Sequence, residues 1–143
     1  MKILKKYHSI FIAFFIIALT LSSCAKINQD RIDGTWTRYK PTNINPEFDE
    51  FWVFRSSEVI IEKEEMVIMP GDTIATLQRV EYERGFYEVS ANIGNTFVKL
   101  SGFDRDEFYT FNKKWEIVDL DKEIFSLSST VGPGAQFIEF YRD

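Results

Sequence analysis

Residues 96–100 read Thr-Phe-Val-Lys-Leu, residues 124–128 read Ile-Phe-Ser-Leu-Ser and residues 136–141 read Gln-Phe-Ile-Glu-Phe-Tyr. In the first stretch, Val98 and Leu100 fall on one side of an extended chain and Lys99 on the other. The other two stretches alternate in the same way. A period of two residues is typical of strands with one buried face. The chain is therefore expected to build its core from sheet.

Short apolar runs separated by turn residues continue from Gly34 onward, and none has the length and period of a helix. Short apolar runs separated by turn residues favour an all-β domain. We expect strands near residues 34–39, 50–55, 58–62, 66–69, 73–83, 86–91, 96–100, 107–111, 115–120, 123–128 and 136–141. The predicted connections include Glu83-Arg84-Gly85, Asn92-Ile93-Gly94-Asn95 and Val131-Gly132-Pro133-Gly134. Successive hairpins predict a small antiparallel up-and-down β-barrel, with a two-sheet sandwich as the alternative.

The first residues have the parts of an export signal. Three lysines precede an apolar run over residues 10–21, which is too short to span a membrane. Leu21-Ser22-Ser23-Cys24 resembles the bacterial lipobox. That resemblance implies removal of residues 1–23 and multiple acylation of Cys24, which anchors a protein stably.

The residues after the cysteine bear on location. Ala25 stands where an aspartate commonly marks inner-membrane retention, and residues 26–29 are not an acidic run of the kind some lineages use for surface display. We expect a lipid anchor in the outer membrane, facing the periplasm. Residues 24–33 would form the lipidated tether and residues 34–143 a single barrel domain.

Composition excludes several functions. Removing residues 1–23 takes away three of 17 basic residues, none of 22 acidic ones and the only histidine, His8, which leaves a net charge of −8. A negative surface repels nucleic acid. Without a histidine or a free thiol, the domain lacks the central groups of Ser-His-Asp or Cys-His catalysis, His-ligated zinc and thiol redox chemistry. We expect no enzyme and no cofactor.

Gly34-Thr35-Trp36 resembles the Gly-x-Trp signature that opens the first strand of lipocalins. In that family the tryptophan closes one end of the barrel and a basic residue after the last strand packs on it, which here implies a pair of Trp36 and Arg142. The segment from Trp115 to Arg142 is similar to the closing strands of lipocalin-like domains on bacterial lipoproteins. The chain departs from lipocalins in lacking a Thr-Asp-Tyr motif, a disulfide and a helix after the last strand.

Three polar motifs are better explained as turns than as sites. Asp104, Asp106 and Glu107 lack the spacing of a calcium loop, so we expect a solvated hairpin turn and no metal. Glu62-Lys63-Glu64-Glu65 is expected to be a charged turn, because adjacent carboxylates on a strand point in opposite directions. Asp72-Thr73-Ile74 resembles a bacterial O-glycosylation acceptor, but a turn is preferred at Thr73.

The leading hypothesis is a non-catalytic, membrane-anchored barrel that binds a small apolar or amphipathic molecule. Its candidate pocket residues are Trp52, Phe54, Phe97 and Trp115, although an eight-stranded barrel can instead be filled by side chains. The alternative is an envelope interaction module that binds a protein or glycan through loops at 40–50 and 129–135. An enzyme using carboxylates alone ranks last.

Overall fold

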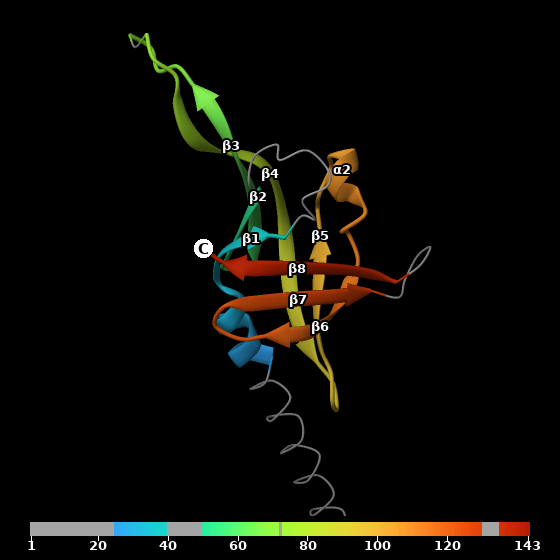
Figure 1. Ribbon diagram of the computed structural model, residues 1–143. Helices are drawn as coiled ribbons and strands as arrows, with labels where there is room; N and C mark the ends of the chain where they lie inside the picture. The colour runs from blue at the N-terminus through green and yellow to red at the C-terminus, as the bar shows by residue number, and fades with distance from the viewer. Residues whose placement is uncertain (1–24, 40–49, 72, 130–134) are drawn as a thin grey trace, which may run out of the picture.

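The computed structural model describes residues 25–39, 50–71, 73–129 and 135–143. Eight antiparallel strands form one closed barrel in sequence order (Figure 1). They are β1 (Gly34–Arg38), β2 (Glu50–Arg55), β3 (Glu58–Val67), β4 (Thr76–Ala91), β5 (Thr96–Ser101), β6 (Lys114–Leu120), β7 (Ile124–Ser129) and β8 (Gln136–Arg142), with a short helix α2 (Asp106–Tyr109) between β5 and β6. The up-and-down barrel predicted from the sequence is confirmed over the sandwich.

The first and last strands close the barrel. Trp36 pairs with Arg142, Thr37 with Tyr141 and Arg38 with Phe140. Residues 25–32 are helical and lie at one end of the barrel, where Ile32 is fully buried (Figure 1). This helical segment occupies the stretch that the sequence suggested was a tether.

Alternating residues of the strands fill the barrel interior with aromatic rings. Each fully buried aromatic residue removes a large apolar surface from water, worth roughly 1.5–3 kcal/mol. The largest such side chains are Trp36, Trp52, Trp115, Phe54, Phe103, Phe108, Phe125 and Phe140.

Two of the turns have clear chemical causes. The predicted turn at residues 92–95 is confirmed, since the Asn92 N–H donates to the Asn95 carbonyl at 2.9 Å and Gly94 has a φ of 100°. Between β2 and β3, Ser56 and Ser57 have φ values of 53° and 71°. Positive φ at both central residues is what a tight hairpin turn requires. The predicted connection at 131–134 lies outside the described residues.

The predicted breaks in β3 and β4 were wrong. Residues 58–62 and 66–69 were expected to be separate strands, but residues 58–67 form one strand, so Glu62-Lys63-Glu64-Glu65 is not a turn. Likewise, Glu83-Arg84-Gly85 lies inside β4. Gly85 is needed for space, because a Cβ there would stand 2.6 Å from the Phe103 ring.

The predicted strand at 107–111 was also wrong. Residues 106–109 form α2, and Phe108 and Phe111 turn into the core. Asn112 fixes this segment: its side chain accepts from the Phe103 N–H at 3.0 Å and donates to the Phe103 carbonyl at 2.7 Å. The aromatic residues that resembled a strand therefore plug one end of the barrel.

Candidate functional site

The ends of the barrel strands bring Trp36 and Arg142 together, as the family resemblance implied. The Arg142 guanidinium lies 4.6 Å from the centre of the indole ring and its Nη1 donates to the Arg31 carbonyl at 3.3 Å. The indole N–H donates to the Ile32 carbonyl at 2.7 Å. Gly34, with a φ of 136°, leaves room for the guanidinium, which would lie 2.9 Å from a Cβ.

Three of the four candidate pocket residues lie in the interior. Trp52 stacks near Phe54 at a centroid distance of 6.2 Å. Phe111 links Trp52 to Trp115, at 5.4 Å and 6.0 Å respectively. Phe97 faces outward beneath the Lys114 ammonium, 4.0 Å from its ring centre, and does not join them.

The interior tryptophans are anchored by hydrogen bonds. The Trp52 indole N–H donates to the buried Glu50 carboxylate at 2.7 Å, and the Trp115 indole N–H donates to the Phe111 carbonyl at 3.0 Å. The same Glu50 oxygen accepts from Arg38 at 3.1 Å. Rings held in this way, with their polar atoms satisfied, behave as packed core.

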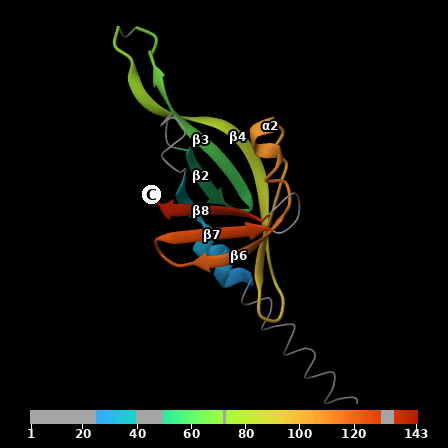
Figure 2. The same cartoon turned by 45° about the vertical axis from the view of Figure 1, so that its right-hand side comes forward.

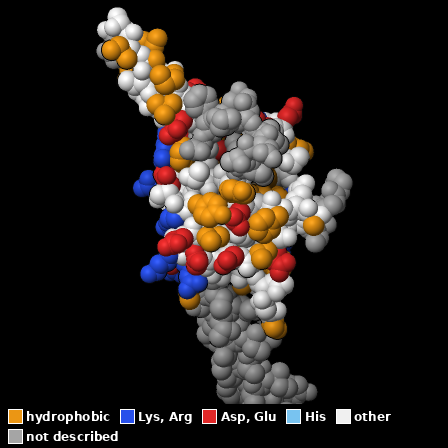
Figure 3. Space-filling view, in the orientation of Figure 1, with side chains coloured by type: hydrophobic (Ala, Val, Ile, Leu, Met, Phe, Trp, Pro, Cys, Tyr) orange, Lys and Arg blue, Asp and Glu red, His pale blue; other side chains and the backbone are white. Residues whose placement is uncertain are grey.

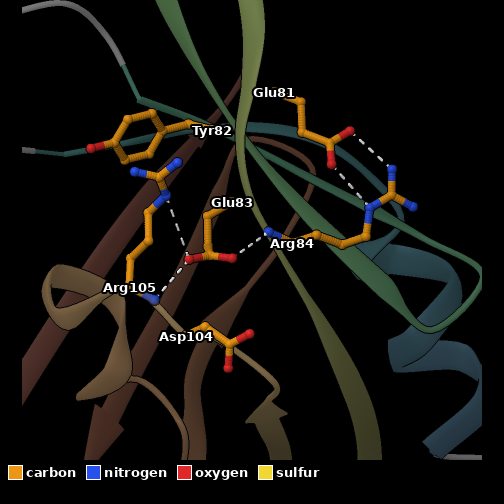
Figure 4. A pocket seen from close by; sticks show the side chains of 6 residues that line it. All are labelled: Glu81, Tyr82, Glu83, Arg84, Asp104 and Arg105. Atoms are coloured by element: carbon orange, nitrogen blue, oxygen red, sulfur yellow. Dashed lines mark hydrogen bonds and ion pairs between the residues drawn. The ribbon is translucent and has the colours of Figure 1, made fainter.

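A surface cavity of about 460 Å³ lies beside β4 and the loop before α2 (Figure 4). Glu81 binds Arg84 through two hydrogen bonds, at 3.1 and 2.9 Å. Glu83 accepts from the backbone N–H groups of Arg84 and Arg105, both at 2.9 Å. Asp104 completes the lining without a bond to the other five residues drawn.

The ion pair in this cavity shifts the pKa values of both of its members. The hydrogen bond from Arg84 lowers the pKa of Glu81, and the same bond raises the pKa of Arg84. A general base works best with a pKa near the operating pH, and these shifts move the groups away from it. The two hydrogen bonds thus hold Glu81 and Arg84 in their charged forms.

A second cavity, of about 540 Å³, opens at the barrel end that carries residues 25–32. Its lining is Asp30, Arg31, Leu120, Asp121, Lys122 and Arg142. Asp121 is engaged by the backbone N–H groups of Glu123 and Ile124, both at 2.7 Å, which lower its pKa. The remaining charges are exposed and of both signs.

Two of the acids predicted to lie in a hairpin turn lie instead at the start of α2, because Asp106 and Glu107 form its first turn. Glu107 binds Lys63 at 2.9 Å. In the described part of the chain, no three His, Cys, Asp or Glu residues are grouped so that they could hold a metal ion. Across the same residues, no helix is both long and apolar enough to cross a membrane.

The most distinctive surface is a projecting hairpin, visible at the top of both ribbon views (Figures 1 and 2). Beyond Lys63, β3 pairs with β4 alone, from Glu64 opposite Arg79 to Val67 opposite Thr76. We call residues 64–71 and 73–79 the arm. Both views place it at the opposite end of the barrel from residues 25–32.

The arm exposes apolar side chains that the barrel does not cover (Figure 3). Its exposed fractions are 62% for Ile68, 74% for Ile74 and 52% for Leu77. Met66 and Met69 are exposed as well. Contiguous exposed apolar surface of this kind usually marks an interaction site.

The root of the arm, where β4 carries Tyr82, is held by contacts with neighbouring side chains. The register shifts between Ile61 and Glu62, so that Tyr82 is an extra residue on β4. Its ring contacts two cations, the Lys63 ammonium at 3.5 Å and the Arg105 guanidinium at 4.1 Å from the ring centre. A bulge bends its strand, and these contacts hold the root against α2, whose Phe108 ring is 6.0 Å away.

Sequence reasoning missed the arm because it split both strands. A signal was present: Asp72 is the only charged residue between Glu65 and Arg79. Thr73 is exposed near the tip. Cys24 lies outside the described residues, as do residues 40–49 and 130–134 of the candidate loops 40–50 and 129–135.

Comparison of the chain with models of known protein families, with curated proteins and with solved structures finds no match. The fold and the surfaces described above are therefore the basis for assigning a function.

Proposed function

We propose that the chain is a non-catalytic, membrane-anchored envelope protein that binds a protein partner through the arm. The observation that carries the proposal is the exposed apolar surface of the arm, with Ile68 and Ile74 more than half exposed. An isolated two-stranded hairpin is at best marginally stable in water, and open apolar strand edges invite pairing. A binding partner would account for both features.

The anchor in this proposal is acylated Cys24 in the outer membrane, on the periplasmic side. The helical residues 25–32 follow it directly and end in the buried Ile32. With the anchor at that end, the arm would point away from the membrane that holds the protein. The barrel would then serve as a rigid base, lipocalin-like in form.

The interior favours this function over transport of a small molecule. Trp52 alone has five aromatic neighbours, at centroid distances of 5.2–6.2 Å. Rings packed at such distances make favourable aromatic contacts with one another. Side chains of the protein itself thus occupy the space in which the leading hypothesis from the sequence would place its ligand.

Site-specific photocrosslinking in cells that make the full chain tests the function. A photoreactive amino acid at Ile68 or Ile74 should give an adduct of one discrete protein mass. The same probe at Lys99, which is exposed on the barrel wall, should not. Equal adducts at all three positions, or none, would overturn the proposal.

A matched pair of surface variants sharpens this test. Met66→Ser with Leu77→Ser should lower the adduct about tenfold, the loss expected from two modest interface contacts. Val118→Ser with Phe137→Ser changes equally exposed apolar residues on the barrel wall and should leave the adduct unchanged.

Native mass spectrometry of residues 25–143 tests the small-molecule alternative. A bare mass, repeated after exposure to envelope lipid extract, is expected for a filled barrel. A reproducible adduct lost on denaturation would instead establish an apolar ligand.

A further inference from the structure

Each face of the arm carries apolar side chains, although polar residues stand beside them. Residues opposite each other in an antiparallel pair point to the same side of the ribbon, and neighbours along a strand point to opposite sides. Met66 and Leu77 are partners on one face, whereas Val67 lies opposite Thr76 on the other. Beyond them, Ile68, Met69 and Ile74 are exposed at the tip. A partner that covered only one face would leave apolar surface in water.

The charges near the base of the arm are unbalanced. Its two cations are already paired with acids elsewhere, Lys63 with Glu107 at 2.9 Å and Arg79 with Asp143 at 2.7 Å. Among the described residues, Glu62, Glu64 and Glu65 form no ion pair within 4.0 Å, and Glu62 and Glu64 act on Arg79 only at longer range, behind Asp143. Toward the barrel, the apolar tip is thus followed by three acids, Glu62, Glu64 and Glu65, which we call the acidic collar.

From this pattern, and resting on the function proposed above, we propose that the partner is a protein with an apolar cleft that encloses the arm from both faces and carries lysine or arginine at its rim. The cleft would take the tip residues, and the rim would meet Glu62, Glu64 and Glu65. Rim charges of this kind steer association and suppress wrong partners more than they add affinity.

The same pattern disfavours two other occupants. A lipid surface presents anionic head groups, which would repel the acidic collar once the apolar tip had entered the bilayer. A second copy of the chain carries the same excess of acids over bases, 22 against 17 in the full sequence, so two copies repel at long range.

Charge reversal of the collar tests the proposal, with the Ile68 adduct as the readout. Glu64→Lys with Glu65→Lys should lower the adduct yield about fivefold at an ionic strength of about 0.15 M and remove most of its salt dependence. Glu65→Lys alone should also lower the adduct yield. This single variant keeps Glu64, the cross-strand neighbour of Arg79. Glu88→Lys with Glu116→Lys, on the exposed barrel wall, is the matched control and should have no effect.

Mapping the adduct by peptide mass spectrometry identifies the occupant. We expect the crosslink in an apolar segment of a different protein, with lysine or arginine at the edge of the cleft. An adduct of twice the chain's mass would establish a second copy, and an adduct with lipid would establish a membrane; either overturns the proposal. A protein adduct insensitive to both collar variants and to salt would overturn the basic rim while leaving the proposed function standing. Absence of any arm-specific adduct would overturn the function itself.

Discussion

At the scale of single residues, Arg142 is expected to stabilise the barrel through the Trp36 ring. Replacing it with alanine should lower the free energy of unfolding in urea by about 1 kcal/mol, the usual worth of a partly exposed cation–π contact. Arg142→Lys should recover part of the loss, because an ammonium keeps the charge but not the flat guanidinium face.

Coupling between the two partners provides the control for that prediction. Once Trp36 is replaced with phenylalanine, the further change Arg142→Ala should cost less than it does in the native chain. Strictly additive losses in the double variant would show that the contact at 4.6 Å contributes no stability of its own.

Tyr87 is expected to make stability depend on alkaline pH. Burial and the hydrogen bond to Asp33 raise the pKa of its hydroxyl well above the ordinary value of 10.0. A raised folded-state pKa gives stability that is fully present below the unfolded pKa and is lost as the pH rises through about 10 toward the folded value. Urea unfolding measured from pH 8 to pH 11 should therefore show falling stability.

Substitution of the tyrosines separates their contributions. Tyr87→Phe should flatten the alkaline decline. Tyr141 also has a raised pKa, caused first by its hydrogen bond to Glu139, but it is exposed at the surface. Tyr141→Phe should therefore change the decline less. An unchanged slope in Tyr87→Phe would exclude Tyr87 as its source.

At the scale of elements, the junction of β4 with the loop before α2 depends on Gly85. A Cβ there would lie 2.6 Å from the Phe103 ring and 2.8 Å from the Ser101 carbonyl oxygen. Gly85→Ala should destabilise the protein by about 1–3 kcal/mol through overpacking, measured by urea unfolding. Ser90→Ala, at an exposed position of the same strand, should change stability by less than about 0.5 kcal/mol. Equal changes in stability for Gly85→Ala and Ser90→Ala would show that the loop carrying Phe103 moves to accept the added methyl group without a loss of stability.

The elements also show what the sequence could predict. Strands with one dry face, such as β5 and β7, were predicted nearly to the residue because burial imposes a period of two. The long β3 and β4 were not, because their outer halves leave the core and nothing there requires alternation. Gly85 resembled a turn residue, but it serves close packing. Phe108 and Phe111 resembled part of a strand. Their burial at the end of the barrel depends on the packing of the complete barrel, which the local sequence does not show.

The candidate site follows the same logic. Trp36 and Arg142 could be paired from the family resemblance, and Trp52 and Phe54 could be placed inside from their alternation. Phe97 was wrongly included in the pocket, because the alternation of Val98 and Leu100 with Lys99 already puts Phe97 on the outer face with Lys99, where the structure has it. The arm could not be predicted, since its exposure depends on where the barrel stops.

At the scale of the whole molecule, the arm is expected to be dispensable for folding. Glu65 and Gln78 are cross-strand partners, so residues 66–77 can be replaced by an Asn-Gly turn that closes the hairpin. None of the removed residues belongs to the buried core, whereas the barrel closure at β1 and β8 and the brace at Tyr82 remain. The free energy of unfolding should therefore change by less than about 1 kcal/mol, measured in urea and by circular dichroism.

The shortened chain separates folding from binding. If the arm evolved for a partner, the variant should also be more soluble, because it removes exposed apolar surface and the open strand edges beside it. It should give no partner adduct when the photoreactive residue is moved to Gln78, next to the new turn. A loss of about 3 kcal/mol or more would be too large for surface residues. The hairpin would then belong to the folding unit, and its apolar side chains would need a structural explanation instead of a partner.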